Sequence, residues 1–311
     1  MSASTVFHVV VGAGPTGSAT ALLLAASGER VRVLSRSGRG PEHPLIERIA
    51  ADATDVSRLV ELTQGAATLF NCAMPAYDRW PTDWPPLAAA LLGTAERTGA
   101  RYVMLGNLYG YGPVDGPMTE DLPMAPSTVK GRVRARMWTD ALAAHDAGRA
   151  LVTEVRAADF LGPGAGSLFN FMVVPQVLAG EPAVYLGDLS APRGWSYTGD
   201  VARTLVAAAR SAESWGRAWH VPSTSTLSPR ALAELLAELT GSPAPKLTRM
   251  SAAELHALGR ENPILAEVEE MLYLMDSGPL SAERTMKTFD LTPTPVSTAL
   301  LEMTAAHTRS T

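Results

Sequence analysis

The chain has 311 residues, 46% of them hydrophobic, and a formal net charge of −5 at pH 7. This length fits one large domain or two coupled domains, and the acidic balance gives no electrostatic reason to expect nucleic acid or an anionic membrane as a partner. A single cysteine excludes an intramolecular disulfide, and six scattered histidines without paired ligand spacing argue against a metal site. Because the chain shows neither a secretion signal nor an apolar run of membrane-spanning length, we expect a soluble cytoplasmic protein.

Short apolar or β-branched runs alternate with longer helical patterns through the first half of the chain. Strands are predicted over residues 6–11, 31–34, 67–71 and 102–105, with a presumed third strand before "ADATD" and a sixth strand in "ALVTEVRAADFLGPG". Helices are predicted up to residue 27 and over residues 82–98 and 130–147, the last two followed by a glycine. This alternation predicts an α/β fold with a Rossmann-type, doubly wound parallel sheet.

From about residue 162 the predicted elements become shorter and more mixed. A strand in "AWHVPS", a capped helix in "SPRALAELLAELTG" and a closing helix in "TFDLTPTPVSTALLEMTA" follow one another. We therefore expect residues 1–161 to form a dinucleotide-binding domain and residues 162–311 a smaller substrate-binding lobe, with some segments returning to the first sheet. Ligands should lie in the crevice between them, at the carboxyl ends of the strands.

The stretch "VVVGAGPTGS" carries Gly-x-Gly-x-x-Gly between a predicted strand and a predicted helix, which is the context that a dinucleotide-binding loop requires. Gly12 permits the tight turn, Gly14 lets the backbone approach a pyrophosphate, and Gly17 lets helix and strand pack closely. The helix start, with Pro15 and Thr16, would then present its N–H groups to the phosphate. The alternative is that the glycines only shape a turn.

The end of the second strand, "VRVLSRSGR", bears on which cofactor fits. An NAD-selective site would place Asp or Glu there, whereas Ser35 and Arg36, with Arg39 nearby, can receive the extra phosphate of NADP. We therefore expect NADP, with NAD as the other possibility; the alternative is an exposed loop arginine. Further on, Asp52 is a candidate contact to the adenine, although helix capping by Asp55 explains part of that pattern equally well.

Together these segments resemble the extended short-chain dehydrogenase/reductase superfamily, in particular its NAD-dependent epimerase/dehydratase group and atypical members. The likeness covers most of the chain through "VVVGAGPTG", "LFNCAMPAY", "RYVMLGNLYGYGP", "TEDLPMAP", "RAADFLGPG" and "PRGWSYTGDVARTL". The resemblance implies an NAD(P)-dependent enzyme that acts on a small molecule and forms a homodimer. It also implies that Ala73 and Met74 pass close to the nicotinamide.

The superfamily normally uses a Ser or Thr, a Tyr and a Lys, and all three positions differ here. Aligning "TEDLPMAPSTVKGRVRARM" with the family's acidic-proline segment puts Lys130 in the tyrosine position and Arg134 in the lysine position. Another register keeps Lys130 as the family lysine and puts Pro126 in place of the tyrosine. We prefer the first register because it keeps Gly131 in its usual place, but neither contains the tyrosine.

A substitute for that tyrosine is physically reasonable. Lys130 and Arg134 are one helical turn apart and should share a face. A lysine that a neighbouring cation and burial bring toward neutrality can act as general acid or base, while Arg134 can clamp the ribose or a substrate oxygen. The alternative is a solvated basic helix face, since Arg132 and Arg136 lie on the same helix.

The serine segment of the family reads "LGNLYG" here, which leaves Gly106 and Asn107 without a hydroxyl. Asn107 can hydrogen-bond a carbonyl instead. Tyr109 and Tyr111, after the fifth strand, are the nearest phenolic proton donors. Tyrosines packed in the core and bonded through their hydroxyls would explain them equally well.

Further residues are expected around the substrate because the resembling proteins use these segments for it. They are Tyr77, Tyr111, Asp159, Phe160, Asn170, Phe171, Arg193 and Trp195. Polar groups among apolar ones are the usual composition of a small-molecule pocket. Trp80 would lie where the substrate enters or, like Trp84, would simply cover the edge of the core. Asp200 would cap a helix. His220 is a candidate proton carrier, although we favour a satisfied histidine at a strand end.

Two functions of different class follow. The first is an NADP(H)-dependent oxidoreductase or epimerase acting on a small carbonyl or hydroxyl compound, with Lys130 and a tyrosine moving the proton. The second is a non-redox isomerase, lyase or cyclase, or a binding scaffold, on a degenerate version of the same fold. The missing tyrosine motivates the second, and the alanine- and arginine-rich composition would suit an enzyme of natural-product biosynthesis.

Overall fold

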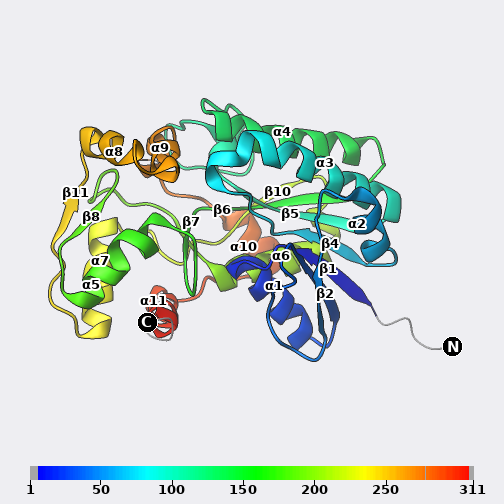
Figure 1. Ribbon diagram of the computed structural model, residues 1–311, viewed down its shortest axis with the longest axis horizontal. Coiled ribbons are helices and arrows are strands. Elements are labelled where there is room, and N and C mark those ends of the chain that lie inside the picture. The colour runs from blue at the N-terminus through cyan, green and yellow to red at the C-terminus, as the bar shows by residue number, and fades with distance from the viewer. Residues whose placement is uncertain (1–5, 277, 308–311) are drawn as a thin grey trace.

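The computed structural model describes residues 6–276 and 278–307 and is organised around a seven-stranded sheet (Figure 1). Neighbouring strands are parallel, in the order β10-β6-β5-β4-β1-β2-β3. The strands are β1 (Phe7–Val11), β2 (Arg30–Ser35), β3 (Ile46–Ala50), β4 (Thr68–Asn71), β5 (Arg101–Asn107), β6 (Val152–Ala157) and β10 (Ala218–His220). The predicted doubly wound, Rossmann-type fold is therefore confirmed.

Helices cover both faces of this sheet, as Figure 1 shows. On one face lie α2 (Val56–Thr63), α3 (Trp80–Thr98) and α4 (Val129–Asp146). On the other face lie α1 (Pro15–Ala26), α6 (Thr198–Arg210) and α10 (Glu283–Phe289). Parallel neighbours cannot be joined by a tight turn, so helical crossovers return the chain between strands and bury both faces.

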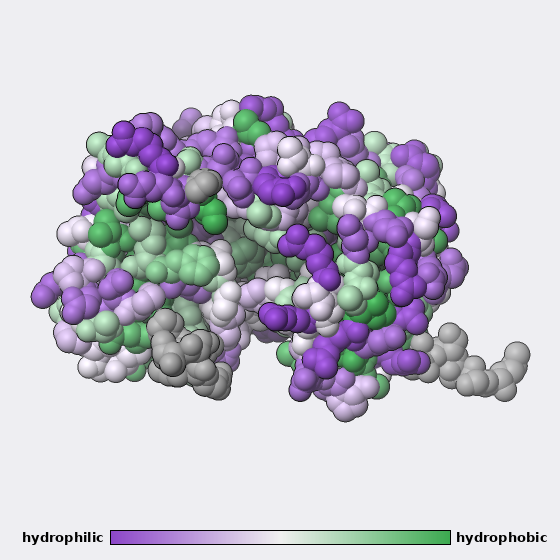
Figure 2. Space-filling model, viewed as in Figure 1, coloured by the Kyte–Doolittle hydropathy of each residue, from purple (hydrophilic) through white to green (hydrophobic). Residues whose placement is uncertain are grey.

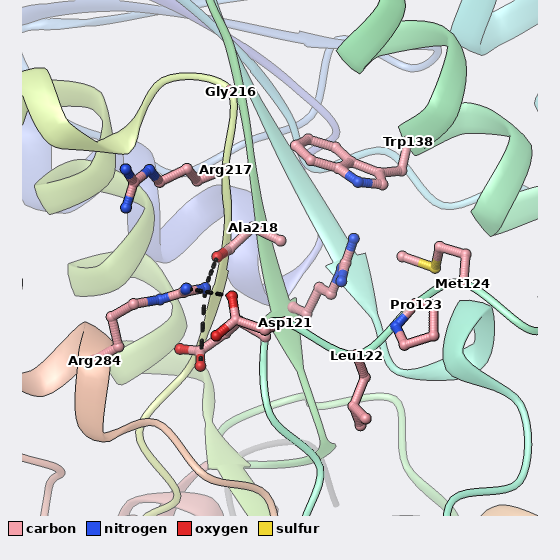
Figure 3. Close-up of a pocket in the computed structure, with 11 residues that line it drawn as sticks. Asp121, Leu122, Pro123, Met124, Trp138, Gly216, Arg217, Ala218 and Arg284 are labelled. Atoms are coloured by element: carbon pink, nitrogen blue, oxygen red, sulfur yellow. Dashed lines mark hydrogen bonds and ion pairs between the residues drawn. The ribbon is translucent and has the colours of Figure 1, made fainter.

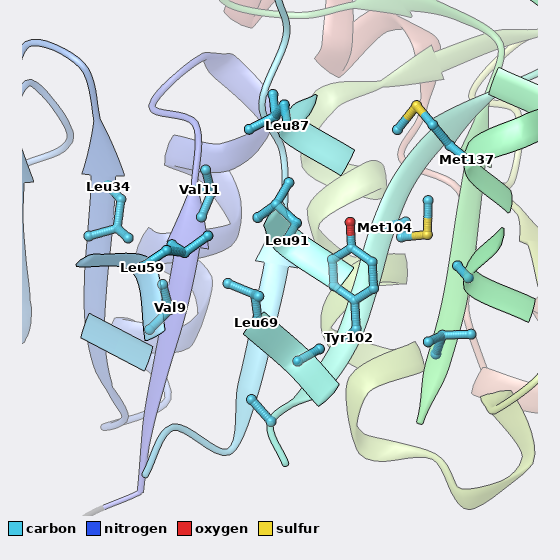
Figure 4. Packing of buried hydrophobic residues seen from close by; sticks show 14 of the residues in the cluster. Val9, Val11, Leu34, Leu59, Leu69, Leu87, Leu91, Tyr102, Met104 and Met137 are labelled. Atoms are coloured by element: carbon cyan, nitrogen blue, oxygen red, sulfur yellow. The ribbon is translucent and has the colours of Figure 1, made fainter. Parts of the chain in front are cut away.

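The first strand shows why its apolar run is continuous. Val9 and Val11 face the α3 layer, where they join a cluster with Leu87 and Leu91 (Figure 4). Val10 packs in the other main cluster, with residues of α1 and α6. A strand that is buried on both faces shows no polar alternation, and each fully buried aliphatic side chain contributes roughly 1.5–3 kcal/mol.

The run after residue 150 forms two strands where the sequence predicted one. β6 ends in the main sheet at Ala157, and β7 (Asp159–Leu161) leaves that sheet to pair in parallel with β9 (Trp195–Tyr197). At the break, the backbone N–H of Ala158 donates to the Ser196 hydroxyl at 3.0 Å, which satisfies a donor that lost its ladder partner. A continuous apolar pattern does not reveal such a change of partner.

The remaining elements build a smaller lobe beside the carboxyl ends of the strands (Figure 1). They are a π-helical turn (Phe169–Val173), α5 (Val174–Ala179), β8 (Ala183–Tyr185), α7 (Pro229–Thr240), β11 (Leu247–Arg249), α8 (Ala252–Gly259), α9 (Pro263–Glu269) and α11 (Val296–His307). Short 3-10 turns lie at Tyr77–Arg79, Tyr109–Tyr111, Ala212–Ser214 and Leu272–Asp276. Strands β8 and β11 pair in parallel. The predicted N-cap of α7 is present: the backbone N–H of Ala231 donates to the side chain of Ser228.

Within the described ranges, no helix combines the length and the apolar character that a membrane crossing would need. Among the same residues, no group of three His, Cys, Asp or Glu side chains is placed to hold a metal ion.

Candidate active site

The loop between β1 and α1 forms an open cradle at the carboxyl end of the sheet. Gly12 has a φ of +104°, and a Cβ there would lie 2.4 Å from the carbonyl oxygen of Cys72. A Cβ on Gly17 would lie 2.0 Å from the carbonyl oxygen of Gly12, whereas a Cβ on Gly14 would meet nothing within 4 Å. Packing requires two of the glycines, and the third faces the open space that a ligand close to the backbone needs.

The start of α1 supplies hydrogen-bond donors to this space. Gly14 is the N-cap and Pro15 is the first helical residue, so the N-cap offers no side chain to the first N–H groups. The positive end of the helix dipole points the same way. Thr16 lies buried behind the loop, and its carbonyl accepts from the Thr20 hydroxyl at 2.8 Å. This part of the chain fits the diphosphate of a dinucleotide.

Ser35 ends β2, Arg36 follows it, and Asp52 lies just beyond the end of the neighbouring strand β3. The Ser35 hydroxyl donates to the carbonyl of Arg39 at 2.8 Å, and Arg36 is exposed. Asp52 is exposed and accepts from the backbone and the hydroxyl of Thr54, and these bonds, with the positive charge of Arg36, hold its pKa below the usual range. A cation at the end of β2 is thus available for a phosphate.

Ala73 and Met74 follow β4 and lie beside the cradle. A Cβ on Gly12 would be 2.7 Å from the backbone nitrogen of Ala73, which donates to the Asn71 side chain at 3.2 Å. Met74 is 58% exposed, and its sulfur lies 4.0 Å from a guanidinium nitrogen of Arg134. These contacts bring the residues after β4 between the cradle and the start of α4.

Lys130 is fully buried and joins the two lobes. Its ammonium pairs with Glu270 of the segment after α9 at 3.0 Å and with Glu267 of α9, and it lies 4.7 Å from the centre of the Tyr77 ring. Glu270 also accepts from the backbone N–H of Val129 at 3.0 Å. The residue that the preferred register puts in the family's tyrosine position is therefore held by carboxylates from the other lobe.

Arg134 takes a separate set of partners. Its guanidinium carbon lies 4.7 Å and 4.3 Å from the ring centres of Trp80 and Trp84, and it donates to the Leu105 carbonyl at 3.3 Å. Burial lowers the pKa of Arg134 to about 10, which still leaves the group charged at neutral pH. The two tryptophans do belong to the core, as expected, but they also clamp this cation.

The expectation of a solvated basic face holds for only part of α4. Arg132 and Arg136 are exposed, whereas Lys130 is 0% and Arg134 is 6% exposed. Neither of the two buried cations points into solvent, because each is enclosed by aromatic rings and by acceptors on neighbouring elements. A buried charge without such partners would cost several kcal/mol.

Tyr77 and Tyr109 form a hydroxyl pair, with their oxygens 3.3 Å apart. The Trp80 ring stacks on Tyr109 at 5.6 Å between centres, and the backbone N–H of Tyr109 donates to the Asn107 side chain at 3.2 Å. Burial raises the pKa of Tyr109 to about 12 and raises that of Tyr77 further. Both hydroxyls keep their protons at neutral pH, so they are suited to donate a proton rather than to accept one.

Gly106 has a structural reason to lack the family's hydroxyl. A Cβ at this position would lie 2.4 Å from a carboxylate oxygen of Glu154 on the next strand. Glu154 in turn pairs with Arg156 at 2.6 Å, and both are buried. A serine at position 106 would collide with this ion pair, so the polar group available nearby is the amide of Asn107.

Some of the candidate residues line a cleft between the lobes, where Figure 2 shows a hollow. A cavity of about 150 Å³ is lined by Met74, Tyr77, Asn107, Leu108, Tyr109, Met118, Ala157, Ala158, Asp159, Phe160, Gly166, Arg193, Gly194, Leu274, Gly278 and Leu280. Asp159 and Arg193 form an ion pair inside it, and Arg193 also reaches the sulfur of Met275 at 3.2 Å. The side chain of Lys130 is not among the lining groups.

Other expected substrate residues lie outside this lining. The Tyr111 hydroxyl is buried between Arg156 and His220, at 2.6 Å from each. Trp195 is fully buried and donates to the Leu227 carbonyl at 2.8 Å. These side chains take part in core packing because the chain behind the cleft needs apolar bulk and satisfied hydroxyls.

Two further expected residues, Asn170 and Phe171, do not line the cavity. Asn170 donates to the carbonyls of Gly162 and Ala165, at 3.3 Å and 2.9 Å, and so holds the loop after β7 in shape. Phe171 is 67% exposed.

His220 is a satisfied buried histidine, as its strand-end position suggested. Its other ring nitrogen meets the Ser281 carbonyl at 2.8 Å, and burial lowers the pKa of His220 to about 3. The expectation for Asp200 is wrong: α6 begins at Thr198, and the Asp200 carboxylate pairs with Arg203 and accepts from the backbone and hydroxyl of Thr294. It anchors the segment before α11 rather than capping α6.

A hollow at the outer edge of the sheet lies apart from the cleft (Figure 3). Arg284 donates to the Ala218 carbonyl at 3.1 Å and pairs with Asp121 at 2.6 Å, while Trp138 and Arg217 also line the hollow. Ala218 begins β10, so the hollow sits by the amino end of that strand. Ligands of such sheets bind at the opposite ends, and we assign no part of the reaction to this hollow.

Sequence reasoning missed the partners of both buried cations. Glu267 and Glu270 lie one helical turn apart in "AEVEE", a spacing that puts two carboxylates on one face. Nothing local says which cation they meet, since Lys130 lies far away in the chain. The tryptophans that enclose Arg134 read equally well as ordinary core residues.

Comparison with known proteins agrees with this geometry. The sequence profile of the NAD dependent epimerase/dehydratase family matches residues 8–221. A search of curated proteins finds no significant match. Among solved structures, MoeE5 in complex with UDP-glucuronic acid and NAD is 23% identical, with a TM-score of 0.79 over 98% of this chain and 100% of that one.

Two more solved structures share the fold. UDP-glucuronic acid 4-epimerase from Bacillus cereus, in complex with NAD, is 16% identical with a TM-score of 0.81 over 98% of this chain and 99% of that one. dTDP-glucose 4,6-dehydratase from Bacillus anthracis, in complex with NAD, is 16% identical with a TM-score of 0.78 over 98% and 97%. The family match extends over most of the chain, and the resemblance seen in the sequence is confirmed: the chain belongs to the NAD-dependent epimerase/dehydratase family, a family of enzymes.

Proposed function

We propose that this chain binds NADP(H) and uses it to oxidise, reduce or epimerise a small carbonyl or hydroxyl compound in the cleft between the lobes. The observation that carries the proposal is the cradle, where packing demands Gly12 and Gly17 while Gly14 faces open space. When bound, the nicotinamide would supply a hydride donor or acceptor. Three structural neighbours, an epimerase, a dehydratase and MoeE5, are all in complex with NAD and favour the same class of chemistry.

Different residues of the chain would bind different parts of the dinucleotide. Gly14 and the start of α1 hold the diphosphate, and Ser35 with Arg36 receives the phosphate that distinguishes NADP from NAD. Ala73 and Met74 support the nicotinamide end, and Asp52 contacts the adenine side. These assignments follow from the fit of the loop before α1 to a diphosphate, and they place the other parts of the dinucleotide accordingly.

We expect NADPH to raise the melting temperature and quench the tryptophan fluorescence of the purified protein, and NADH to do so only at higher concentration. Replacing the exposed Arg36 by alanine should weaken NADPH binding about tenfold, because an exposed charge-assisted bond to phosphate is worth about 1.4 kcal/mol. Binding of NADH should not change. Titration of both dinucleotides into both proteins measures this.

Arg136→Ala, on the outer face of α4, is the matched control and should bind NADPH as the wild type does. Equal affinity for NADH and NADPH, unaffected by Arg36→Ala, would remove the preference for NADP. No response to either dinucleotide would remove the proposed function itself.

Tyr109 is the proton donor that the geometry favours. It lines the cavity, its pKa is raised to about 12, and Asn107 and Trp80 hold its ring and backbone in place. Lys130, which the sequence suggested for this role, positions the ring of Tyr77 beside that donor. Arg134 supports the same wall through Trp80.

Tyr109→Phe should lower carbonyl-dependent oxidation of NADPH about a hundredfold and leave NADPH affinity unchanged, since general acid catalysis contributes about that much. Steady-state rates on a panel of small ketones and aldehydes test this. Tyr77→Phe keeps the donor and should retain most of the rate. Full activity of Tyr109→Phe would move the donor to another group.

A non-redox isomerase, lyase or cyclase is the second candidate. The observation that favours it is the Lys130 ammonium in the tyrosine position, held by two carboxylates rather than placed over the cleft. Product formation with no change in nicotinamide absorbance, equally fast with NADP⁺ and NADPH, would select this candidate over the first.

A further inference from the structure

Two cations near the first cavity are already paired with carboxylates of the protein. Lys130 is paired with Glu267 and Glu270, and Arg193 is paired with Asp159. Among the described residues that line the cavity, Asp159 and Arg193 are the only charged side chains, and they face each other. The described lining therefore offers an arriving anion no unbalanced positive charge.

Arg134 does not supply the missing charge. It is 6% exposed, enclosed between two indole rings, and bonded to the Leu105 carbonyl. Withdrawing it toward the cavity would leave that carbonyl unpaired and give up both ring contacts. Each such loss costs about 1 kcal/mol or more.

The walls of the cavity are mostly apolar. Met74, Leu108, Met118, Phe160, Leu274 and Leu280 provide them. Methionine side chains are flexible and polarisable, and they adapt to irregular apolar ligands. The same lining contains a few hydrogen-bonding groups, chiefly the hydroxyls of Tyr77 and Tyr109 and the amide of Asn107.

Apolar surface continues into the smaller lobe. A second cavity of about 470 Å³ is lined mostly by apolar groups, which include Leu186, Met250, Leu255, Leu272 and Tyr273, and the exposed Arg249 is the charged side chain of its described lining. The hydrophobic cluster behind it includes Tyr77, which also lines the first cavity. The two cavities thus share one apolar partition, in the lobe where the rest of a substrate would extend.

Binding a diphosphate in the first cavity would cost free energy. A diphosphate carries about two charges that need cationic partners once they leave water. To bind one, Arg193 would have to leave Asp159, whose carboxylate would then face the incoming anion. An uncharged molecule needs no such rearrangement, and burial of its apolar surface provides the affinity.

We propose that the cleft takes an uncharged, largely apolar molecule with one carbonyl or hydroxyl group, of the size of a fused-ring or long-chain compound, rather than a nucleotide sugar. This inference rests on the proposed function, because it names the substrate class of the same site. The hydroxyls of Tyr77 and Tyr109 meet the single oxygen of that molecule, and the methionine and leucine walls cover its hydrocarbon part.

The test is a set of binding titrations on the whole protein saturated with NADP⁺, with trans-1-decalone, UDP-glucose and UDP-glucuronic acid as ligands. Decalone should bind at least about tenfold more tightly than either nucleotide sugar, a difference of about 1.4 kcal/mol. Nucleotide sugars that bind as tightly as decalone or more so would overturn the inference. Failure of NADP⁺ to bind would instead overturn the proposed function, and decalone binding without NADP⁺ would leave the inference standing.

Charge release gives a second, sharper test. Asp159→Asn should remove a carboxylate partner of Arg193 and raise the affinity for UDP-glucuronic acid about tenfold while decalone binding stays within about twofold. Asp140→Asn is the matched control: it frees Arg136 on the exposed face of α4 and should change neither affinity. Unchanged UDP-glucuronic acid affinity in folded Asp159→Asn overturns the proposed charge balance.

If Asp159→Asn does not fold, Leu274→Glu serves in its place. Leu274 lies half-buried in the apolar wall, so a carboxylate there should weaken decalone binding about tenfold. Decalone binding that is unaffected by this substitution contradicts the proposed apolar wall.

Discussion

Replacing Glu267 and Glu270 together by glutamine should lower the free energy of unfolding by about 3 kcal/mol. Lys130 has no exposed surface, and these carboxylates neutralise its charge where water cannot. The glutamine amides still accept hydrogen bonds, so the expected loss lies at the lower end for a broken buried pair. Urea unfolding, followed by tryptophan fluorescence, measures it.

The same pair of substitutions in a Lys130→Met background provides the control. With no charge left to bury, the triple variant should recover roughly half of the lost stability or more. If the double variant unfolds within about 0.5 kcal/mol of the wild type, Lys130 does not depend on this pair and the contact between α4 and α9 is not a source of stability.

Gly14→Val should impair NADPH binding and leave stability intact, whereas Gly17→Ala should impair stability. At position 14 a side chain enters open space, so the protein should keep its melting temperature but bind NADPH at least about a hundredfold more weakly, because the valine occupies the place of the diphosphate. At position 17 even a methyl group would lie 2.0 Å from the Gly12 carbonyl. That variant should lose about 3 kcal/mol of stability or fail to fold.

Melting curves and NADPH titrations on both variants separate the two effects. Gly93→Ala is the control for a helical glycine whose Cβ would meet nothing within 4 Å: it should bind NADPH as the wild type does and melt at the same temperature or slightly higher, because alanine favours the helix. Wild-type NADPH affinity in Gly14→Val would show that the loop before α1 is not the diphosphate site, and the proposed function would fall with it.

The cradle could be predicted from the sequence because its causes are local. Gly12, Gly14 and Gly17 sit between a buried strand and a helix, and their spacing alone fixes the turn, the open face and the close packing. The order of strands and helices was also predictable, since continuous apolar runs and glycine stops mark them.

The catalytic side of the site depends on contacts that sequence cannot reveal. Lys130 meets Glu270 from 140 positions away, and no spacing rule links them. Asp159 enters the cleft because β7 leaves the main sheet after Ala157, a change of strand partner that the apolar pattern of the run conceals. In both cases the local sequence is compatible with more than one structure, and tertiary packing determines which of them forms.

Asp200 illustrates the same limit at a helix end. An aspartate just before a helical run is the usual sign of an N-cap, yet α6 starts earlier and the carboxylate serves Thr294, far along the chain. Local propensity predicted a carboxylate that satisfies backbone donors. It could not predict that the donor is the backbone N–H of Thr294.

The single thiol of the chain forms part of the floor of the cradle. Cys72 is 6% exposed, its carbonyl closes against Gly12, and burial raises the pKa of its thiol to about 12. Almost none of it is thiolate at physiological pH, and oxidants and alkylating reagents attack thiolates. The thiol in the floor of the cradle should therefore resist oxidants and alkylating reagents in the folded protein, and the nucleotide loop needs no reducing environment to keep its shape.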